Sequence, residues 1–161
     1  MMKIIFLDDH RPDALTAARL LTALGHTVLH TDCTSLAQVY ARINPPDMVI
    51  AALFPDGTTG IDEDGLCVAM AAQFHNPDVV TILLSDSVVF GQGELFAMLS
   101  SLRCVLPRAF CVHDLVETAQ YYLKSTQWER RRNELVGELD DCPPYKPASA
   151  RSDEQMMPAA G

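Results

Sequence analysis

The stretch KIIFLDD, residues 3–9, is a short apolar run that ends in two acidic residues. An unbroken apolar run without alternation is typical of a central strand in a parallel sheet, which is buried on both faces. The acidic pair marks the point where such a strand ends and meets solvent. Pro12 follows closely, and proline is favoured in the first turn of a helix. This stretch therefore predicts a strand, a short junction that carries two carboxylates, and a helix.

The alternation of strand and helix continues along the chain. The sequence predicts strands at 3–7, 26–31, 47–54, 79–84 and 104–106, and helices at 12–24, 36–43, 66–75, 94–102 and 113–139. Parallel neighbours need long crossover connections, and these connections are right-handed. The pattern therefore predicts an α/β fold with a doubly wound, five-stranded parallel sheet in a three-layer α/β/α arrangement. Such sheets place ligand chemistry at the carboxyl ends of their strands.

Length and composition predict one main domain. A chain of 161 residues with 48% hydrophobic residues can bury one substantial core. We expect this domain at residues 1–125, an extension of the last helix at 126–139 and a disordered tail at 140–161. The tail is rich in proline and poor in large apolar residues. No output domain is expected after it.

Charge and residue usage exclude several classes of function. The net charge of -9 disfavours binding to nucleic acid or to an anionic membrane. No signal peptide or membrane-spanning run is visible in the sequence, so we expect a cytoplasmic protein. The five cysteines include no CxxC pair, and the five histidines have no ligand spacing. These features predict reduced thiols and no metal centre built from these residues.

Four motifs, IIFLDD, PDMVI, ILLS and LPRAF, end at or near predicted strand ends in this order along the chain. Their order and spacing resemble the receiver domain of bacterial response regulators, a CheY-like domain with a flavodoxin-like (βα)5 fold. The resemblance covers roughly residues 3–123. It implies a signalling domain in which a sensor kinase's phosphoryl group is transferred to an aspartate.

The resemblance also implies a role for each strand end. In the family, an acidic pair holds magnesium, an aspartate on the third strand accepts the phosphoryl group, and a hydroxyl and a lysine bind its oxygens. An aromatic residue on the fifth strand responds to the hydroxyl. Asp8 and Asp9 match the acidic pair, and Ser85 matches the hydroxyl. The acceptor position falls on Ala52 when counted forward from Pro46-Asp47, and on Ala51 when counted back from Pro55.

The other positions also depart from the family pattern. Arg108 stands in place of the lysine, and Val105 stands in place of the aromatic residue. Ala109 replaces a proline that commonly follows a cis peptide bond in the family, so we expect a trans bond there. A methyl group has no lone pair with which to attack phosphorus. The sequence therefore predicts a pseudo-receiver that is not an enzyme and has no catalytic residue.

The predicted vestigial phosphate pocket consists of Asp8, Asp9, Ala52, Ser85 and Arg108, with Val105 as a degenerate switch. With one acidic ligand missing, Asp8 and Asp9 form at most a weak magnesium site, and no cofactor is expected. The favoured function is a stand-alone receiver-like protein of a two-component or phosphorelay pathway. It would act by phosphorylation-independent contact with a histidine kinase, a phosphotransferase or another regulator.

Two alternatives stay open at this point. The first is a small-molecule sensor or an enzyme on a flavodoxin-like scaffold that uses the vacated pocket. The second is a conventional phosphorylated regulator with a relocated acceptor such as Asp56. For protein contact, including a homodimer, we expect either the first helix or the face formed by the fourth and fifth helices with the fifth strand. The candidate contacts on that face are Phe90, Leu95, Phe96, Leu99, Tyr121 and Tyr122.

Overall fold

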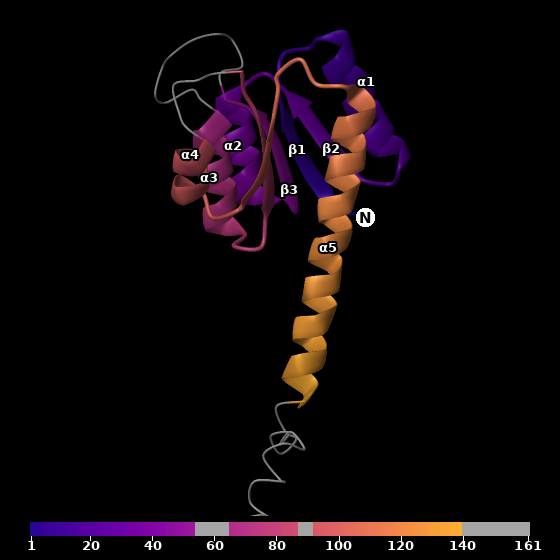
Figure 1. Cartoon of the computed structure of the whole chain (residues 1–161), viewed down its shortest axis with the longest axis vertical. Coiled ribbons are helices and arrows are strands. Elements are labelled where there is room, and N and C mark those ends of the chain that lie inside the picture. The colour runs from indigo at the N-terminus through magenta and orange to yellow at the C-terminus, as the bar shows by residue number, and fades with distance from the viewer. Residues whose placement is uncertain (54–64, 87–91, 140–161) are drawn as a thin grey trace, which may run out of the picture. The chain divides into compact units, whose positions relative to one another are not determined.

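Strands and helices alternate strictly in the computed structural model, which describes residues 1–53, 65–86 and 92–139 (Figure 1). The strands are β1 (Lys3–Leu7), β2 (Thr27–Thr31), β3 (Met48–Ala52), β4 (Val80–Leu84) and β5 (Leu102–Leu106). The helices are α1 (Pro12–Ala23), α2 (Thr34–Ile43), α3 (Gly65–His75), α4 (Gln92–Met98) and α5 (Val112–Leu139). Three of the predicted features, namely Asp56, Phe90 and the tail from Asp140, lie outside the described residues.

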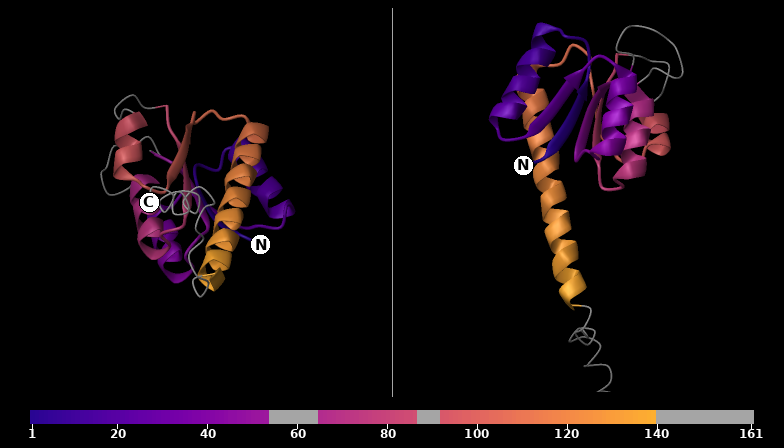
Figure 2. Two further views of the ribbon diagram at one scale, coloured as in Figure 1. Left: turned by 60° about the horizontal axis from the view of Figure 1, so that its bottom comes forward. Right: turned by 180° about the vertical axis from the view of Figure 1, so that it is seen from behind.

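The five strands form one parallel sheet in the order β2-β1-β3-β4-β5. This order is that of flavodoxin-like folds, in which the chain winds outward from β1 in both directions. Figures 1 and 2 show α1 and the first turns of α5 on one face of the sheet, and α2, α3 and α4 on the other. The predicted three-layer, flavodoxin-like α/β class is confirmed.

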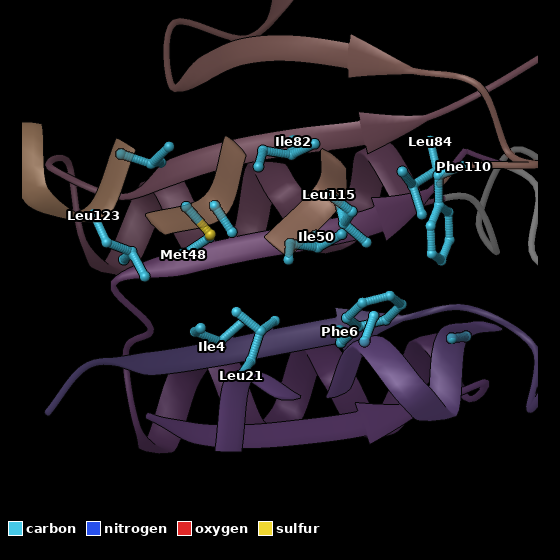
Figure 3. Close-up of a cluster of buried hydrophobic side chains, with 14 of the residues drawn as sticks. Ile4, Phe6, Leu21, Met48, Ile50, Ile82, Leu84, Phe110, Leu115 and Leu123 are labelled. Atoms are coloured by element: carbon cyan, nitrogen blue, oxygen red, sulfur yellow. The ribbon is translucent and has the colours of Figure 1, made fainter. Parts of the chain in front are cut away.

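Alternate residues of the central strands point into two cores, one on each face of the sheet. Phe6, Ile50 and Ile82 pack against Leu21 of α1 and Leu115 of α5 (Figure 3). Their neighbours point to the other face and pack beneath α2, α3 and α4. The residues of this second core include Ile5, Val49, Leu83, Ala37, Ala41, Ala69, Ala72, Leu95 and Leu99. Burial on both faces explains why β3 is apolar throughout and why Thr81 is the one polar residue of β4.

The predicted boundary between α4 and β5 was wrong. Residues 99–102 were expected to continue the helix, whereas α4 ends at Met98 and β5 begins at Leu102. Ser101 explains the difference. Its carbonyl accepts a hydrogen bond from the Thr81 backbone at 3.0 Å, and its hydroxyl shares a buried 2.9 Å hydrogen bond with the Thr81 hydroxyl. This tertiary pairing with β4 outweighs the local helical pattern.

Residues Met1–Gln127 form one compact unit, and the chain from Trp128 onward is a separate unit. The helix α5 itself is continuous from Val112 to Leu139. Within the described residues, no helix combines the length and apolar character that crossing a membrane requires.

Gly65 allows the first turn of α3 to pass directly over the end of β3. Its backbone N–H donates a hydrogen bond to the Leu53 carbonyl at 3.0 Å. A Cβ atom at Gly65 would lie 2.1 Å from the carbonyl oxygen of Ala52 and 3.1 Å from the Cβ atom of Ala51. Because the nearest of these atoms belongs to the backbone of a buried strand, it cannot move aside at low cost. This close approach holds α3 against the carboxyl edge of the sheet.

We therefore predict that Gly65→Ala lowers the free energy of unfolding by about 2–4 kcal/mol, because the new methyl group overlaps with the β3 backbone. Gly93→Ala is the matched control, since a Cβ atom at Gly93 meets nothing within 4 Å. This control lies in helix α4 and is expected to be neutral or to stabilise by up to about 1 kcal/mol. Urea unfolding of both variants measures the difference. Equal stabilities would show that the β3–α3 approach relaxes freely.

Candidate functional site

The acidic pair lies where β1 ends at the carboxyl edge of the sheet. Asp8 is 0% exposed, and Asp9 is half-buried. The backbone N–H of Asp8 donates to the Thr31 carbonyl at 3.1 Å, which fixes the turn beside β2. The Asp8 Oδ1 atom accepts a hydrogen bond from the Asp9 backbone at 2.8 Å. A carboxylate that is this deeply buried requires a positively charged partner or further donors.

Two arginines supply that positive charge. Arg11 Nη2 lies 2.7 Å from Asp8 Oδ2, and Arg108 Nη2 lies 2.6 Å from Asp9 Oδ2 and 3.5 Å from Asp8 Oδ1. Arg11 Nη2 also donates to the backbone carbonyl of Arg108 at 2.9 Å. We call these four residues the arginine–aspartate cluster. Two guanidinium groups thus cover two carboxylates, and the charges of the cluster balance.

Neighbouring groups hold both arginines in place. The guanidinium carbon of Arg11 lies 5.9 Å from the centre of the Phe110 ring, within the range of a cation–π contact. Phe110 in turn packs edge-on against Phe6 of β1, with ring centres 6.3 Å apart. The backbone N–H of Arg108 donates to Asp86 Oδ1 at 3.1 Å. The cluster is therefore anchored to the ends of β1 and β4 and to the β5–α5 connection.

The acceptor position carries methyl groups in either register of the family motif. Ala51 and Ala52 are both 0% exposed. Ala52 belongs to the same core as Phe6, whereas Ala51 belongs to the core on the opposite face. Leu7 pairs with Ala51 in the sheet, so the next step of this register places Asp8 level with Ala52. The strand end beside the acidic pair therefore offers no side-chain oxygen.

The residues at this edge do not fit a magnesium ion. Magnesium requires oxygen ligands in near-octahedral geometry and retains several waters. Here the third acidic group is replaced by alanine, and guanidinium groups already engage the Asp8 and Asp9 carboxylates. In the described segments, no three histidine, cysteine, aspartate or glutamate side chains come together as a metal site.

The remaining predicted pocket residues lie near the same edge. Ser85 is half-buried after β4, and its backbone N–H donates to the Leu106 carbonyl at 2.9 Å. Val105 is partly buried on β5 and packs against the core beneath α2–α4. The peptide bond between Arg108 and Ala109 is trans, as expected. The fold thus brings Asp8, Asp9 and Arg108 into contact, with Ala52 and Ser85 at the ends of the adjoining strands.

Sequence reasoning missed two residues at this edge, Arg11 and His30. The spacing of three residues between Asp8 and Arg11 was the available signal for the first. His30 of β2 packs edge-on against Phe6 and His10, with ring centres 5.2 and 4.9 Å apart. Burial lowers the pKa of His30 below its usual 6.5, and the charge of His10 lowers it further. Hydrogen bonding to the Asp8 backbone raises the pKa of His30 and so partly offsets these two effects.

The predicted contact face formed by α4, α5 and β5 is not continuous. Leu95 is 2% exposed and Leu99 is 0% exposed, because both point under α4 into the core. Tyr121 is 67% exposed, but it lines a groove with Leu24 of α1. Tyr122 is half-buried and donates a long 3.4 Å hydrogen bond to the Arg103 carbonyl. Leu95 and Leu99 are therefore core residues, and the prediction that they contact a partner was wrong.

Solved structures share this fold at low sequence identity. The signal receiver domain of a putative LuxO repressor from Vibrio parahaemolyticus has a TM-score of 0.65 and 13% identity, over 80% of this chain and 95% of that chain. A CheY-like response regulator receiver domain from Methanospirillum hungatei has a TM-score of 0.66 and 12% identity, and the match covers 80% of this chain and 98% of that chain. No protein-family model and no curated protein matches the sequence.

A third structure belongs to a family of redox sensors in the streptococci that evolved from two-component response regulators. It has a TM-score of 0.67 and 13% identity to this chain. The match covers 91% of this chain but only 57% of the streptococcal one, so this chain spans little more than half of that protein. Together the three structures establish that the chain has the receiver-domain fold.

The contacts of Arg11 generate a prediction about stability. Arg11→Met keeps much of the side-chain volume but leaves the buried Asp8 carboxylate with the longer ion pair to Arg108 and the hydrogen bond from the Asp9 backbone. We expect the free energy of unfolding to fall by about 2–4 kcal/mol. Arg19→Met, at an exposed position of α1, serves as the control and should change stability by less than about 0.5 kcal/mol. Equal losses in urea unfolding would show that Arg11 does not neutralise Asp8.

The lowered pKa of His30 generates a prediction about pH. Because the folded protein binds a proton at His30 less readily than the unfolded chain does, the free energy of unfolding falls as the pH falls through 6.5. This loss of stability levels off once the pH is below the pKa of His30 in the folded protein. His30→Gln should therefore flatten this dependence, while His26, whose pKa burial also lowers, keeps part of it. Urea unfolding between about pH 7.5 and 5 measures the slope. The exposed-site control is His75→Gln. If His30→Gln gave the same dependence of unfolding free energy on pH as the wild type and this control, His30 would not be a source of that dependence.

Proposed function

We propose that this protein is a receiver-like signalling protein of a two-component or phosphorelay-type pathway that acts through protein contact and accepts no phosphoryl group. The observation that carries the proposal is the end of β3, where Ala51 and Ala52 are both fully buried. Phosphoryl transfer to a side chain needs an oxygen nucleophile held in line with the phosphorus atom. Neither methyl group can serve as one.

The carboxylates near this position also support the proposal. Asp8 and Asp9 pair with Arg11 and Arg108, and Asp86 accepts a hydrogen bond from the Arg108 backbone. A carboxylate engaged in this way is a weaker nucleophile, because its negative charge is already stabilised by its partners. The same ion pairs supply the positive charge that magnesium would bring. We therefore propose that the domain is not an enzyme, uses no phosphoryl acceptor and needs no metal cofactor.

Without a phosphoryl switch, the surface of the domain determines its activity. We propose partners of the kind that receiver folds serve, namely a histidine kinase, a phosphotransferase or another regulator in the cytoplasm. The streptococcal redox sensors that evolved from response regulators provide a precedent for this fold in a different signalling role. The low identity of all three neighbours means that the partner itself has to be identified by experiment.

The proposal predicts that phosphoryl donors leave the protein unchanged. Backbone amide spectra are recorded with magnesium alone, with magnesium and acetyl phosphate, and with magnesium and beryllofluoride. We expect no shifts at the ends of β3, β4 and β5 beyond those caused by sodium chloride of equal ionic strength, because no acceptor oxygen is available. A conventional receiver domain treated with the same reagents is the positive control. A base-labile phosphoryl adduct on any carboxylate would overturn the proposal.

A further inference from the structure

The layer formed by α2, α3 and α4 is apolar on its outer side as well as on its inner side. These helices are grouped on one face of the sheet (Figure 2). Their inner side chains form the second core, whereas seven large apolar side chains remain exposed to solvent. These seven residues, which we call the α2–α4 face, are Leu36, Val39, Ile43, Met70, Phe74, Phe96 and Met98.

The spacing of these residues follows the helices. Leu36, Val39 and Ile43 lie three and four residues apart and therefore form one stripe along α2. Met70 and Phe74 lie four residues apart on α3, and Phe74 is 82% exposed. A helix that is apolar on nearly all sides, as α3 is apart from Gln73 and His75, is normally buried on nearly all sides. In the single chain only one side of α3 is covered.

The α2–α4 face also lacks charge. The three helices contain one arginine, Arg42, and one carboxylate, Glu94. Their formal charges cancel, although the whole chain carries a net charge of -9 and 20% of its residues are charged. Charged residues such as Asp32 and Asp78 instead occupy the turns that adjoin α2 and α3. This distribution, with an apolar centre and charges in the surrounding turns, is that of a protein–protein interface.

The opposite side of the sheet, which α1 and α5 cover, carries charged residues among its apolar ones. The groove between α1 and α5 is lined by apolar groups from Leu24 and Val116, but also by Glu117, Lys124 and His113. Exposed apolar side chains are therefore interrupted by charge on that side. Among the described residues, the combination of large exposed apolar groups with almost no charge distinguishes the α2–α4 face from the groove between α1 and α5.

We propose that the α2–α4 face binds the same face of a second copy of this chain, which goes beyond the function proposed above. A dimer with two-fold symmetry brings identical surfaces together. Any net charge on the contact face would therefore be repelled by the same charge on the partner copy. Two copies that each carry -9 repel one another overall. The α2–α4 face is a neutral surface on which they can meet without adding to that repulsion.

The size of the face agrees with this occupant. Seven side chains exposed to this extent present an apolar area on the order of 700 Å², since a fully exposed aromatic side chain contributes about 150–250 Å². A standard interface buries about 800 Å² on each partner. An anionic membrane fits the face less well, because Arg42 is the one arginine or lysine on the three helices and membrane-binding faces are rich in both.

Sedimentation equilibrium of the full chain tests the proposal. The wild-type protein is expected to have twice the monomer mass of 17.7 kDa at micromolar concentrations. Phe74→Glu and Ile43→Glu, on α3 and α2, should each weaken self-association by at least about tenfold, because each buries an unpaired charge in the interface. Tyr121→Glu, at an exposed position on α5, is the matched control and should leave the dissociation constant within about twofold.

Circular dichroism and urea unfolding establish that each variant is folded before it is compared. A wild-type chain that remains monomeric up to about 100 μM would overturn the proposal. A different protein would then be the candidate partner for the α2–α4 face. Dissociation by Tyr121→Glu, with both other variants still dimeric, would place the contact on the α1–α5 side and would equally overturn it. Neither result depends on phosphoryl donors. The dimer proposal can therefore be overturned while the proposed function stands, and the reverse.

Discussion

The buried carboxylate of Asp8 is the constraint on which the carboxyl edge of the sheet depends. A negative charge without access to water must be neutralised nearby, and Arg11 and Arg108 do this from segments that are 97 residues apart in the chain. Arg11 also donates to the carbonyl of Arg108, so the start of α1 and the β5–α5 connection are joined directly. Through Asp86, the end of β4 joins the same network. The edge is therefore held together by side chains at the place where a receiver domain would hold a metal ion.

This arrangement bears on how such a domain could signal. A switch requires two states whose balance a ligand or a modification changes through its different affinity for each. At this edge Ala52 offers no group to modify, and Val105 provides no ring that could change position with Ser85. The electrostatic balance of the cluster is complete within the chain itself. On the function proposed above, the fold thus retains the architecture of a receiver domain, while its activity follows from a surface that does not depend on a chemical event.

The sequence predicted the fold well because the fold depends on local patterns. IIFL, MVI and ILL are continuous apolar runs, and each lies in a central strand that is buried on both faces. The site was predicted only in part. The family motif located Asp8, Asp9 and Arg108. The three-residue spacing from Asp8 to Arg11 does not by itself show that Arg11 turns back onto Asp8, since Pro12 beside it also marks a helix start. Leu95 and Leu99 illustrate a second limit. A helical apolar spacing shows that one side of a helix is covered, but it does not show whether its own core or a partner covers that side.

The arginine–aspartate cluster and the α2–α4 face have opposite physical characters, and this contrast favours the α2–α4 face as the contact surface. The arginine–aspartate cluster is charged, but its charges are satisfied within the chain, so a partner gains little by approaching it. The seven residues of the α2–α4 face are uncharged, Arg42 and Glu94 are the two charged residues of the helices that carry it, and its apolar side chains are exposed in the single chain. Covering them releases free energy at about 25 cal/mol per Å² of apolar surface removed from water. On the two proposals above, the α2–α4 face drives association, and the strand edge, which carries the signal in a phosphorylated receiver domain, acts as part of the scaffold.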